Sequence, residues 1–368
     1  MSTKWQREVL ADNVLQFTKG DERIFAPHLL KNRYVVKGIL SAAGGFGIIY
    51  IAEDMHLFGR RVLIKARRYD NEPGLFSYAF DDKRKDKILK IRKQIQFEFN
   101  CLKNFKEKAE ARMPNVNDIV YDFSPAIHGP HKDVTGEFFT EKDPELAYNE
   151  PYIVMQMIDG ENLGDLIDGG IDALLEQRGY EHYRFWEHEV LQYTLELCTI
   201  FENFHRQNPE KRNLYFLYQD LKPENIMLTH DMFLTLIDFG GMTAVRADSQ
   251  GAMHSNWPNL GSPGTGTWGF KSPEMNPNNK MLSKLDQRVD VYTLGVTVYH
   301  LLTGDNPAKF KDEYQRIPYE NLERFKITEA TKTLIRKATE PDREKRYQNM
   351  TQIRKHIYDV CFREIKKF

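Results

Sequence analysis

The chain has 368 residues and a net charge of -1 at pH 7, from 52 lysines and arginines and 53 aspartates and glutamates. Hydrophobic residues make up 41% of the chain and charged residues 29%, which are ordinary proportions for a globular protein and exclude a disordered one. The length predicts two lobes or domains. Because the charges balance, general electrostatic binding of nucleic acid is not indicated, and we expect no nucleic-acid partner.

Apolar runs and cysteines bear on the expected location of the chain. A helix needs about 18–20 apolar residues to span a bilayer, and the longest candidate, residues 291–302, is short and contains His300. The N-terminal residues lack the apolar core of a secretory signal. The three cysteines are far apart and odd in number, which predicts neither a zinc site nor a disulfide framework. We therefore expect no membrane segment and a reducing, cytoplasmic location.

Residues 1–33 are polar and mixed in composition, and we expect them to form an N-terminal extension. Five apolar residues recur in this extension at helical spacing, which predicts a short packed helix. These residues are Trp5, Val9, Leu10, Val14 and Leu15.

A sheet-rich first lobe is predicted over residues 34–158. Short runs rich in β-branched and aromatic residues, separated by turn residues, are typical of an antiparallel sheet. The predicted strands are 34–40, 48–52, 61–65, 119–123 and 152–157. One helix is predicted between the third and fourth strands, at residues 83–108.

Two charged segments of this lobe are open to more than one interpretation. Seven of the eleven residues 83–93 are Lys or Arg. Such a run is usually a solvated helix face, and the alternative is a docking surface for an acidic partner. Pro125 to Pro151 is rich in Pro, Gly, His and charged residues, which predicts a long exposed loop or a small hairpin.

The remainder of the chain, residues 159–368, is predicted to be mainly helical. The helical patterns lie near 161–168, 186–206, 288–303, 329–339 and 350–366. A sheet-rich first part and a helix-rich remainder predict an α+β fold with two unequal lobes.

A glycine-containing run, Ser-Ala-Ala-Gly-Gly-Phe-Gly-Ile-Ile at residues 41–49, lies between two predicted strands. This position argues against a dinucleotide-binding or Walker-type loop, which must open a helix to use the dipole at its N-terminus. Glycines in a hairpin allow backbone amides to approach a phosphate-bearing ligand closely. A plain hairpin turn is the alternative.

Lys65 ends the apolar run Val-Leu-Ile of the third predicted strand. A lysine in an apolar strand needs an anionic partner if it is buried, and Glu98 on the predicted helix is a candidate. The alternative for Lys65 alone is a surface side chain that extends to solvent.

The densest group of chemically useful side chains lies within residues 218–240. It contains the run Tyr-Gln-Asp-Leu-Lys-Pro-Glu-Asn and, thirteen residues after its asparagine, the triplet Asp-Phe-Gly. Mg²⁺ prefers hard oxygen ligands, which Asn225 and Asp238 can supply. Asp220 can accept the proton of an incoming hydroxyl group, and Lys222 can neutralise charge on a moving phosphoryl group. The pattern therefore indicates metal–triphosphate chemistry.

In this order, seven segments resemble the motifs of eukaryotic-type protein kinases of the Ser/Thr class, over about residues 34–354. They are the glycine-containing run at 41–49, Val-Leu-Ile-Lys ending at Lys65, the run at 218–225, Asp-Phe-Gly at 238–240, Ser-Pro-Glu at 272–274, Asp290 in Asp-Val-Tyr-Thr-Leu-Gly, and Arg346 in Glu-Lys-Arg-Tyr. The resemblance implies a bilobal kinase fold with a small antiparallel-sheet lobe plus one helix and a larger helical lobe. It also implies ATP with Mg²⁺ (or Mn²⁺), and protein substrates with Ser or Thr hydroxyl groups.

The resemblance implies roles for individual residues. Asp220 would be the base, Lys222, Lys65 and Glu98 would complete the catalytic set, and Asn225 and Asp238 would be the metal ligands. The expected cofactor-binding residues are Ala42, Ala43, Gly44, Gly45, Phe46, Gly47, Ile49, Leu63, Lys65, Met155, Gln156, Ile158, Asn162 and Met227.

The resemblance assigns the phosphates, the adenine and the ribose of the nucleotide to different residues of this set. Backbone amides of the glycine run would cover the phosphates, and Ile49, Leu63 and Met227 would enclose the adenine. Met155 would be the gatekeeper, backbone groups of Gln156 and Ile158 would contact the adenine, and Asn162 would contact the ribose.

Three further matches are implied to support the fold or the activation segment. Asp290 and the pair formed by Glu274 and Arg346 resemble residues that stabilise the larger lobe, so we exclude them from the site. Thr267, after Gly266, matches the threonine that contacts the catalytic loop in Ser/Thr kinases.

Several residues depart from the family pattern. Ala42 replaces the first glycine of the loop, and Leu63 replaces the usual alanine, which predicts a narrower adenine slot. Tyr218 and Gln219 replace the histidine and arginine that precede the base. Because Gln219 is uncharged, it cannot pair with a phosphate on the activation loop, and we expect basal activity without phosphorylation of that loop. The hydroxyl groups available there are Thr243, Ser249, Ser255, Ser262 and Thr265.

Two runs, Tyr-Gln-Asp-Leu-Lys-Pro-Glu-Asn at 218–225 and Gly-Phe-Lys-Ser-Pro-Glu at 269–274, resemble soluble bacterial kinases of the mycobacterial protein kinase G type, over the kinase core only. Two alternatives of function stay open. A small-molecule kinase on the same fold would lack the full activation segment that residues 264–274 provide, and a pseudokinase scaffold would lack some of the six chemistry-bearing positions that are filled here.

Overall fold

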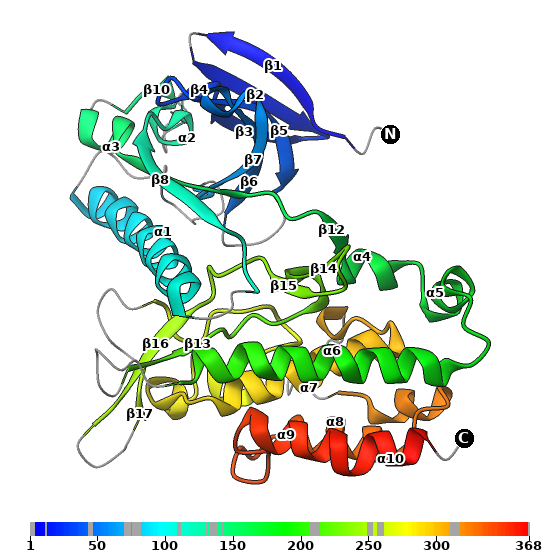
Figure 1. Cartoon of the computed structure of the whole chain (residues 1–368). Coiled ribbons are helices and arrows are strands. Elements are labelled where there is room, and N and C mark those ends of the chain that lie inside the picture. Colours follow the sequence, from blue (N-terminus) through cyan, green and yellow to red (C-terminus); the bar gives the residue numbers. More distant parts are fainter. Residues whose placement is uncertain are drawn as a thin grey trace. The chain divides into compact units, whose positions relative to one another are not determined.

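Figure 1 shows the computed structural model of the chain. The described residues are 4–11, 13–42, 47–69, 75, 82–108, 112–129, 131–132, 138–141, 143–206, 214–248, 253–255, 261–309 and 317–366. The chain forms two compact units. The first comprises Met1–Asn104 and Pro114–Met157, and the second comprises Phe105–Met113 and Ile158–Phe368.

The N-terminal extension is a three-stranded antiparallel sheet of the first unit, so the helix predicted there is wrong. Its strands are β1 (Gln6–Ala11), β2 (Val14–Lys19) and β3 (Glu22–Pro27). Leu15 and Phe17 are buried, which is the alternation of a strand with one buried face.

Two turns explain why the strands form where a helix was expected. Asn13 has φ 60° and Gly20 has φ 61°, and both lie in the left-handed region that suits Asn and Gly in tight turns. Taken alone, the apolar residues at 14 and 15 are compatible with the repeat of about 3.6 residues in a helix and with the repeat of about 2 residues in a strand. The turn residues on both sides of β2 leave it six residues long, and that length decides for the strand.

The main sheet of the first unit has six antiparallel strands in the order β4-β5-β6-β7-β11-β8. The five predicted strands are confirmed within it. The six strands are β4 (Leu29–Leu30), β5 (Tyr34–Ser41), β6 (Ile48–Asp54), β7 (Arg60–Ala66), β8 (Val116–Asp122) and β11 (Glu150–Gln156). Val36 and Val154 of this sheet share one apolar core with Leu15 of the N-terminal sheet, so the extension is an integral part of the unit.

The basic start of the predicted helix is only partly a solvated face. The helix is α1 (Asp82–Lys108), and Arg84 and Arg92 on it are buried. Arg84 forms an ion pair with Glu141, and Arg92 Nε lies 3.0 Å from Glu150 Oε2. Arg84, Lys85 and Arg92 therefore pair with acidic residues of their own unit, whereas Lys83, Lys90 and Lys93 are exposed.

The acidic partners come from the segment between β8 and β11, which was predicted to be an exposed loop or small hairpin. It contains α2 (Pro125–His128), the hairpin β9 (His131–Lys132) and β10 (Phe138–Phe139), and α3 (Pro144–Tyr148). The hairpin is confirmed. Full exposure is wrong, because Ile127 and Leu146 are buried in one cluster with Ile88 of α1.

The second unit is mainly helical (Figure 1). Its described helices are α4 (Leu163–Asp168), α5 (Ile171–Arg178), α6 (Tyr183–Phe204), α7 (Arg288–Thr303), α8 (Glu329–Ala338), α9 (Met350–His356) and α10 (Phe362–Ile365). The single helix predicted at 350–366 is interrupted by a π-helical turn, Ile357–Cys361. Within the described part of the chain, no helix combines the length and apolar character needed to cross a membrane.

Two small antiparallel sheets carry the loops of the second unit. One consists of β12 (Gly160–Asn162), β14 (Ile226–Thr229) and β15 (Leu234–Leu236), and the other of β13 (Leu214–Leu217), β16 (Thr243–Ala247) and β17 (Met253–His254). The segment from β13 to β14 therefore runs from one sheet to the other, and both of its ends are fixed.

Three predicted support residues occupy the expected places in the second unit. Arg346 Nη1 and Nη2 lie 2.6 Å and 2.9 Å from the two carboxylate oxygens of Glu274, and both side chains are buried. The buried carboxylate of Asp290 accepts hydrogen bonds from the backbone N–H groups of Tyr218 (3.1 Å) and Gln219 (2.8 Å). These contacts fix the loop that follows β13 to α7.

Substitution of Arg346 by Met should lower the free energy of unfolding by about 3–5 kcal/mol, because Glu274 would stay buried without its cation. Arg336→Met is the matched control. Arg336 is 42% exposed and pairs with Glu323, so its loss should cost less than about 1 kcal/mol. Denaturant unfolding of the two variants measures the difference, and equal losses would contradict a structural role for the buried pair.

Candidate active site

Lys65 and Glu98 form a buried ion pair in the first unit. Lys65 lies on β7, opposite Ile49 of β6 and Ile153 of β11, and Lys65 Nζ lies 2.6 Å from Glu98 Oε1 on α1. The two side chains are 3% and 4% exposed. A buried charge is tolerated only with such a partner, so the geometry fixes the ammonium group at one place on the sheet.

Four of the residues expected to bind the nucleotide share one face of this sheet. Leu63 and Lys65 are two residues apart on β7, and Met155 lies opposite Leu63, so these side chains and that of Ile49 project on the same side. Met155 is buried in one cluster with Ile95 of α1. The sheet therefore places an apolar surface next to the Lys65 ammonium group.

Two ends of the glycine-containing run are described. Gly47 approaches β7 so closely that a Cβ atom there would lie 2.3 Å from the Ala66 carbonyl oxygen, so only glycine fits. The Ala42 carbonyl accepts a hydrogen bond from Arg68 Nη1 at 2.6 Å. The predicted nucleotide contacts of Ala43, Gly44, Gly45 and Phe46 lie outside the described residues.

Two expected hinge residues straddle the division between the units, with Gln156 in the first and Ile158 in the second. The Gln156 N–H donates to the Asn115 carbonyl at 2.8 Å, and the Gln156 side chain accepts from Asn115 Nδ2 at 2.7 Å. The backbone group that Gln156 can offer to an adenine is therefore its carbonyl.

Asp220 is the centre of the catalytic-loop geometry. Its side chain is buried, and its Oδ1 accepts hydrogen bonds from Thr267 N at 2.7 Å and Thr267 Oγ1 at 2.8 Å. Lys222 Nζ donates to the same Thr267 Oγ1 at 2.7 Å. The expected contact of Thr267 with this loop is confirmed, and it holds the carboxylate and the lysine in one arrangement.

The two expected metal ligands belong to the same unit as Asp220 and differ in their contacts. Asn225 Nδ2 donates to the Asp220 carbonyl at 2.7 Å, which orients the opposite amide oxygen away from that bond. Asp238 is half-buried, and its Oδ1 accepts a hydrogen bond from Gly240 N at 2.9 Å. An amide oxygen and a carboxylate are the hard donors that Mg²⁺ prefers, so this donor set fits the metal.

Burial raises the pKa of Asp220 above its ordinary value, while Lys222 and the Thr267 hydrogen bonds act in the opposite direction. Nearby Asp238 adds to the increase. A carboxylate with a raised pKa is a stronger base than an ordinary aspartate, which suits it to accept a proton from a hydroxyl group.

Loss of the Thr267 hydroxyl should move the acid limb of the pH–rate profile. Activity needs ionised Asp220, so the rate rises with pH through the Asp220 pKa. Thr267→Ala removes a hydrogen bond that lowers this pKa, and the limb should shift to higher pH. Thr267→Ser keeps the hydroxyl and should leave the limb in place. A shift to lower pH in Thr267→Ala would contradict the assignment of the limb to Asp220.

Asn162 and Met227 are adjacent across β12 and β14. Asn162 Oδ1 accepts from Gly164 N at 2.8 Å and caps α4, and Asn162 Nδ2 donates to the Glu224 carbonyl at 2.8 Å. Both ends of the amide therefore have structural partners, and the expected ribose contact stays a prediction.

Gln219 has a positioning role that the sequence analysis missed. It is fully buried with φ 68°, and its Nε2 donates to the Gly241 carbonyl at 2.5 Å and lies 3.3 Å from the Ser262 carbonyl and from Thr265 Oγ1. Its Oε1 accepts from Gly264 N at 2.8 Å. An amide carries a donor and an acceptor, and here it connects both ends of the segment that follows Asp238.

The sequence matches the model of the protein kinase domain over residues 84–359. The chain belongs to the protein kinase family. This assignment agrees with the α+β content and the antiparallel sheets described above.

Bacterial relatives of this kinase chain include proteins named as serine/threonine kinases. A probable serine/threonine-protein kinase of Streptomyces coelicolor (SCO3848) is 25% identical over 343 residues, which are 91% of this chain and 41% of that protein. Serine/threonine-protein kinase PknB of Mycobacterium leprae is 25% identical over 347 residues, 91% of this chain and 44% of that protein. The kinase chain thus spans less than half the length of these relatives, and the narrower resemblance to the protein kinase G type stays a prediction.

Proposed function

We propose that this chain is a Ser/Thr protein kinase that transfers the γ-phosphate of ATP to hydroxyl groups of proteins. The observation that carries the proposal is the group formed by Asp220, Lys222 and Thr267, in which the hydroxyl of Thr267 links the lysine to the carboxylate. Asp220 accepts the proton of the attacking hydroxyl, and Lys222 stabilises charge on the transferred group. The names of the bacterial relatives support the same acceptor class.

Each residue of the proposed nucleotide site has a separate role. Lys65, fixed by Glu98, binds the α- and β-phosphates, and Asn225 and Asp238 hold Mg²⁺ or, as an alternative, Mn²⁺. The bound metal neutralises charge on the phosphates. Ile49, Leu63, Met155 and Met227 form the apolar surroundings of the adenine, with backbone groups of Gln156 and Ile158 as its polar contacts.

Incubation of the chain with Mg²⁺ and ATP labelled in the γ- or the α-phosphate tests this function. We expect label on serine and threonine of an acceptor protein from γ-labelled ATP, and none from α-labelled ATP. Transfer of α-label would indicate AMP transfer, and γ-label on small molecules alone would indicate a small-molecule kinase. Nucleotide binding without any transfer would indicate a pseudokinase. Each of these three results would overturn the proposal.

Gln219 replaces the arginine–phosphate pair that orders the activation segment in many kinases. Its neutral amide already binds Gly241, Ser262 and Gly264, so the segment is held without a phosphate. Thr243 and Ser255 are buried, and alanine at every hydroxyl of the segment would disturb packing. Removal of phosphate is the cleaner test.

Phosphatase-treated enzyme, with its phosphate-free state verified by intact mass, should keep activity within about tenfold of untreated enzyme. Gln219→Leu should lower kcat by about 10–100-fold, since it removes roughly two to three neutral hydrogen bonds of about 1 kcal/mol each. Gln177→Leu, an exposed glutamine of α5, is the control. A loss above about a hundredfold on phosphate removal, equivalent to about 2.7 kcal/mol, would refute independence from phosphorylation.

A cytoplasmic location is the compartment we propose. Cys101, Cys198 and Cys361 are free and buried, and burial raises the pKa of each thiol. Such thiols are protected from oxidation and need no disulfide partner, which suits a reducing compartment.

A further inference from the structure

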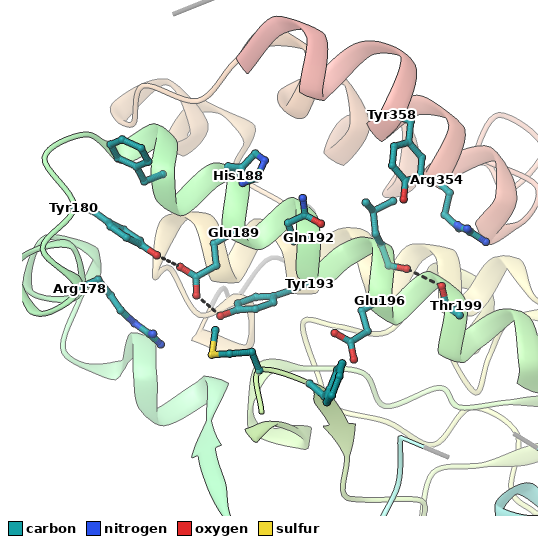
Figure 2. Close-up of a pocket in the computed structure, with 14 residues that line it drawn as sticks. Arg178, Tyr180, His188, Glu189, Gln192, Tyr193, Glu196, Thr199, Arg354 and Tyr358 are labelled. Carbon is teal, nitrogen blue, oxygen red and sulfur yellow. Dashed lines mark hydrogen bonds between the residues drawn. The ribbon is translucent and has the colours of Figure 1, made fainter. Parts of the chain in front are cut away.

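A groove in the second unit is separate from the residues assigned to phosphoryl transfer. It has a volume of about 620 Å³ and runs along α6, between the β14–β15 turn and the C-terminal helical segment (Figure 2). The side chains that carry the argument are Arg178, Tyr180, Phe185, Glu189, Met232 and Tyr358. None of its lining residues belongs to the catalytic, metal or nucleotide sets.

Exposed apolar side chains gather at this groove. In the described part of the second unit, six large apolar side chains are exposed, and four of them line the groove: Phe185, Met232, Phe233 and Tyr358. Their exposed fractions lie between 48% and 57%. Single exposed apolar residues are common, whereas a contiguous group marks an interaction surface.

Met232 is the least expected of these residues. It lies in the β14–β15 turn with φ 63°, in the left-handed region where Gly or Asn costs less than a long apolar side chain. Its side chain is 57% exposed, so burial does not compensate this backbone cost. The hydrogen bonds of the turn, from Met232 N to the Thr229 carbonyl (2.9 Å) and from Thr229 N to the Phe233 carbonyl (2.9 Å), hold this backbone, and the turn presents the Met232 side chain to the groove.

The charge of the groove selects the partner. Glu189 accepts hydrogen bonds from the Tyr180 and Tyr193 hydroxyl groups (Figure 2). Burial, together with Glu189, raises the pKa of Tyr180 to about 12, so this phenol stays a donor at neutral pH. A carboxylate offers about four acceptor sites, and two of them stay available here.

The other charged residues of the groove already have partners of opposite charge. Arg354 Nη1 lies 2.8 Å from Glu202, Arg178 Nη2 lies 3.3 Å from Glu161, and the Glu196 carboxylate lies 3.4 Å from Arg112. Among the described residues, no Lys, Arg or His nitrogen forms an ion pair with Glu189. Its negative charge is therefore left for a cation from outside and opposes binding of phosphate groups.

We propose that this groove docks an extended segment of a partner protein with a Lys or Arg beside Glu189 and apolar side chains against Met232, Phe233 and Tyr358. The segment is distinct from the Ser or Thr that receives phosphate, so docking goes beyond the proposed function. The negative charge of Glu189 disfavours nucleic acid and anionic lipid as occupants.

Selection from a phage-displayed library of random 12-residue peptides tests the proposal. The selection uses the full chain with the substitution Asp220→Asn, so that failure of phosphoryl transfer cannot affect the outcome. We expect selected peptides to combine Lys or Arg with neighbouring large apolar residues. A selection that yields no such enrichment, or that yields acidic sequences, would overturn the proposal.

Matched variants then test whether the selected peptides occupy this groove. Glu189→Gln should weaken peptide binding at least fivefold and reduce its dependence on salt, whereas Glu176→Gln, an exposed carboxylate of α5 outside the groove, should leave it unchanged. Met232→Asn suits the left-handed turn and keeps Glu189, and it should also weaken binding at least fivefold. Unchanged affinity in both Glu189→Gln and Met232→Asn would place the peptides elsewhere and refute docking here.

Discussion

Asp220→Asn should reduce protein phosphorylation by about 10²–10⁴-fold, which is the usual contribution of a positioned acid or base. The substitution keeps the size of the side chain and its acceptor oxygen, so the hydrogen bonds from Thr267 N and Oγ1 can persist. It removes the negative charge and the ability to take up a proton. The loss should therefore appear in kcat, with little change in the affinity for ATP.

Asp168→Asn is the control for this substitution, because Asp168 is an exposed carboxylate at the end of α4. It should keep full activity. Both variants should unfold at the denaturant concentration of the wild type. Asp220→Asn with more than about a tenth of the wild-type kcat would contradict the role of Asp220 as the base.

Lys65→Met should lower kcat/KM by about 10²–10³-fold, the range for loss of one preorganised electrostatic contact to the reacting phosphates. The change also leaves Glu98 buried without its cation, which destabilises the first unit by about 3–5 kcal/mol. The single variant therefore mixes a catalytic loss with a structural one.

The double substitution Lys65→Met with Glu98→Leu separates these effects. Replacing a buried ion pair by apolar side chains of similar size is often neutral for stability, so this variant should unfold close to the wild type. Its activity should stay as low as that of Lys65→Met. Recovery of activity together with stability would show that Lys65 acts only by supporting the fold.

Local sequence patterns were sufficient to predict most elements of the fold. β-branched runs between turn residues gave β5, β6 and β7 their correct places, and α7 was predicted with its observed bounds, Arg288–Thr303. The error in the N-terminal extension has a physical cause, because a few apolar residues fit periods of 2 and 3.6 equally well. Only the turn residues at Asn13 and Gly20 distinguish them.

Contacts between distant segments were the part that the sequence could not provide. The prediction for the basic start of α1 considered only the residues of the helix itself. The acidic partners Glu141 and Glu150 lie more than 50 residues later in the chain. No spacing rule relates these positions. A charge run therefore predicts exposure only until the acidic residues that neutralise it are located.

In the candidate site, too, the sequence predicted some contacts and missed others. Family motifs indicated that Thr267 would contact the catalytic loop, and the structure places its hydroxyl between Asp220 and Lys222. The resemblance also indicated what Gln219 lacks, which is the charge of an arginine. The bonds that its amide makes to Gly241 and Gly264 depend on a left-handed backbone and on close packing, which the residue type alone does not encode.

A crystal structure of the chain with Mg²⁺ and a non-hydrolysable ATP analogue tests the central claim most directly. We predict Asn225 Oδ1 and an Asp238 carboxylate oxygen at about 2.0–2.1 Å from the metal, Lys65 Nζ bonded to the α- and β-phosphates, and the γ-phosphate facing Asp220. A nucleotide bound elsewhere, or a metal held without Asp238, would contradict the account.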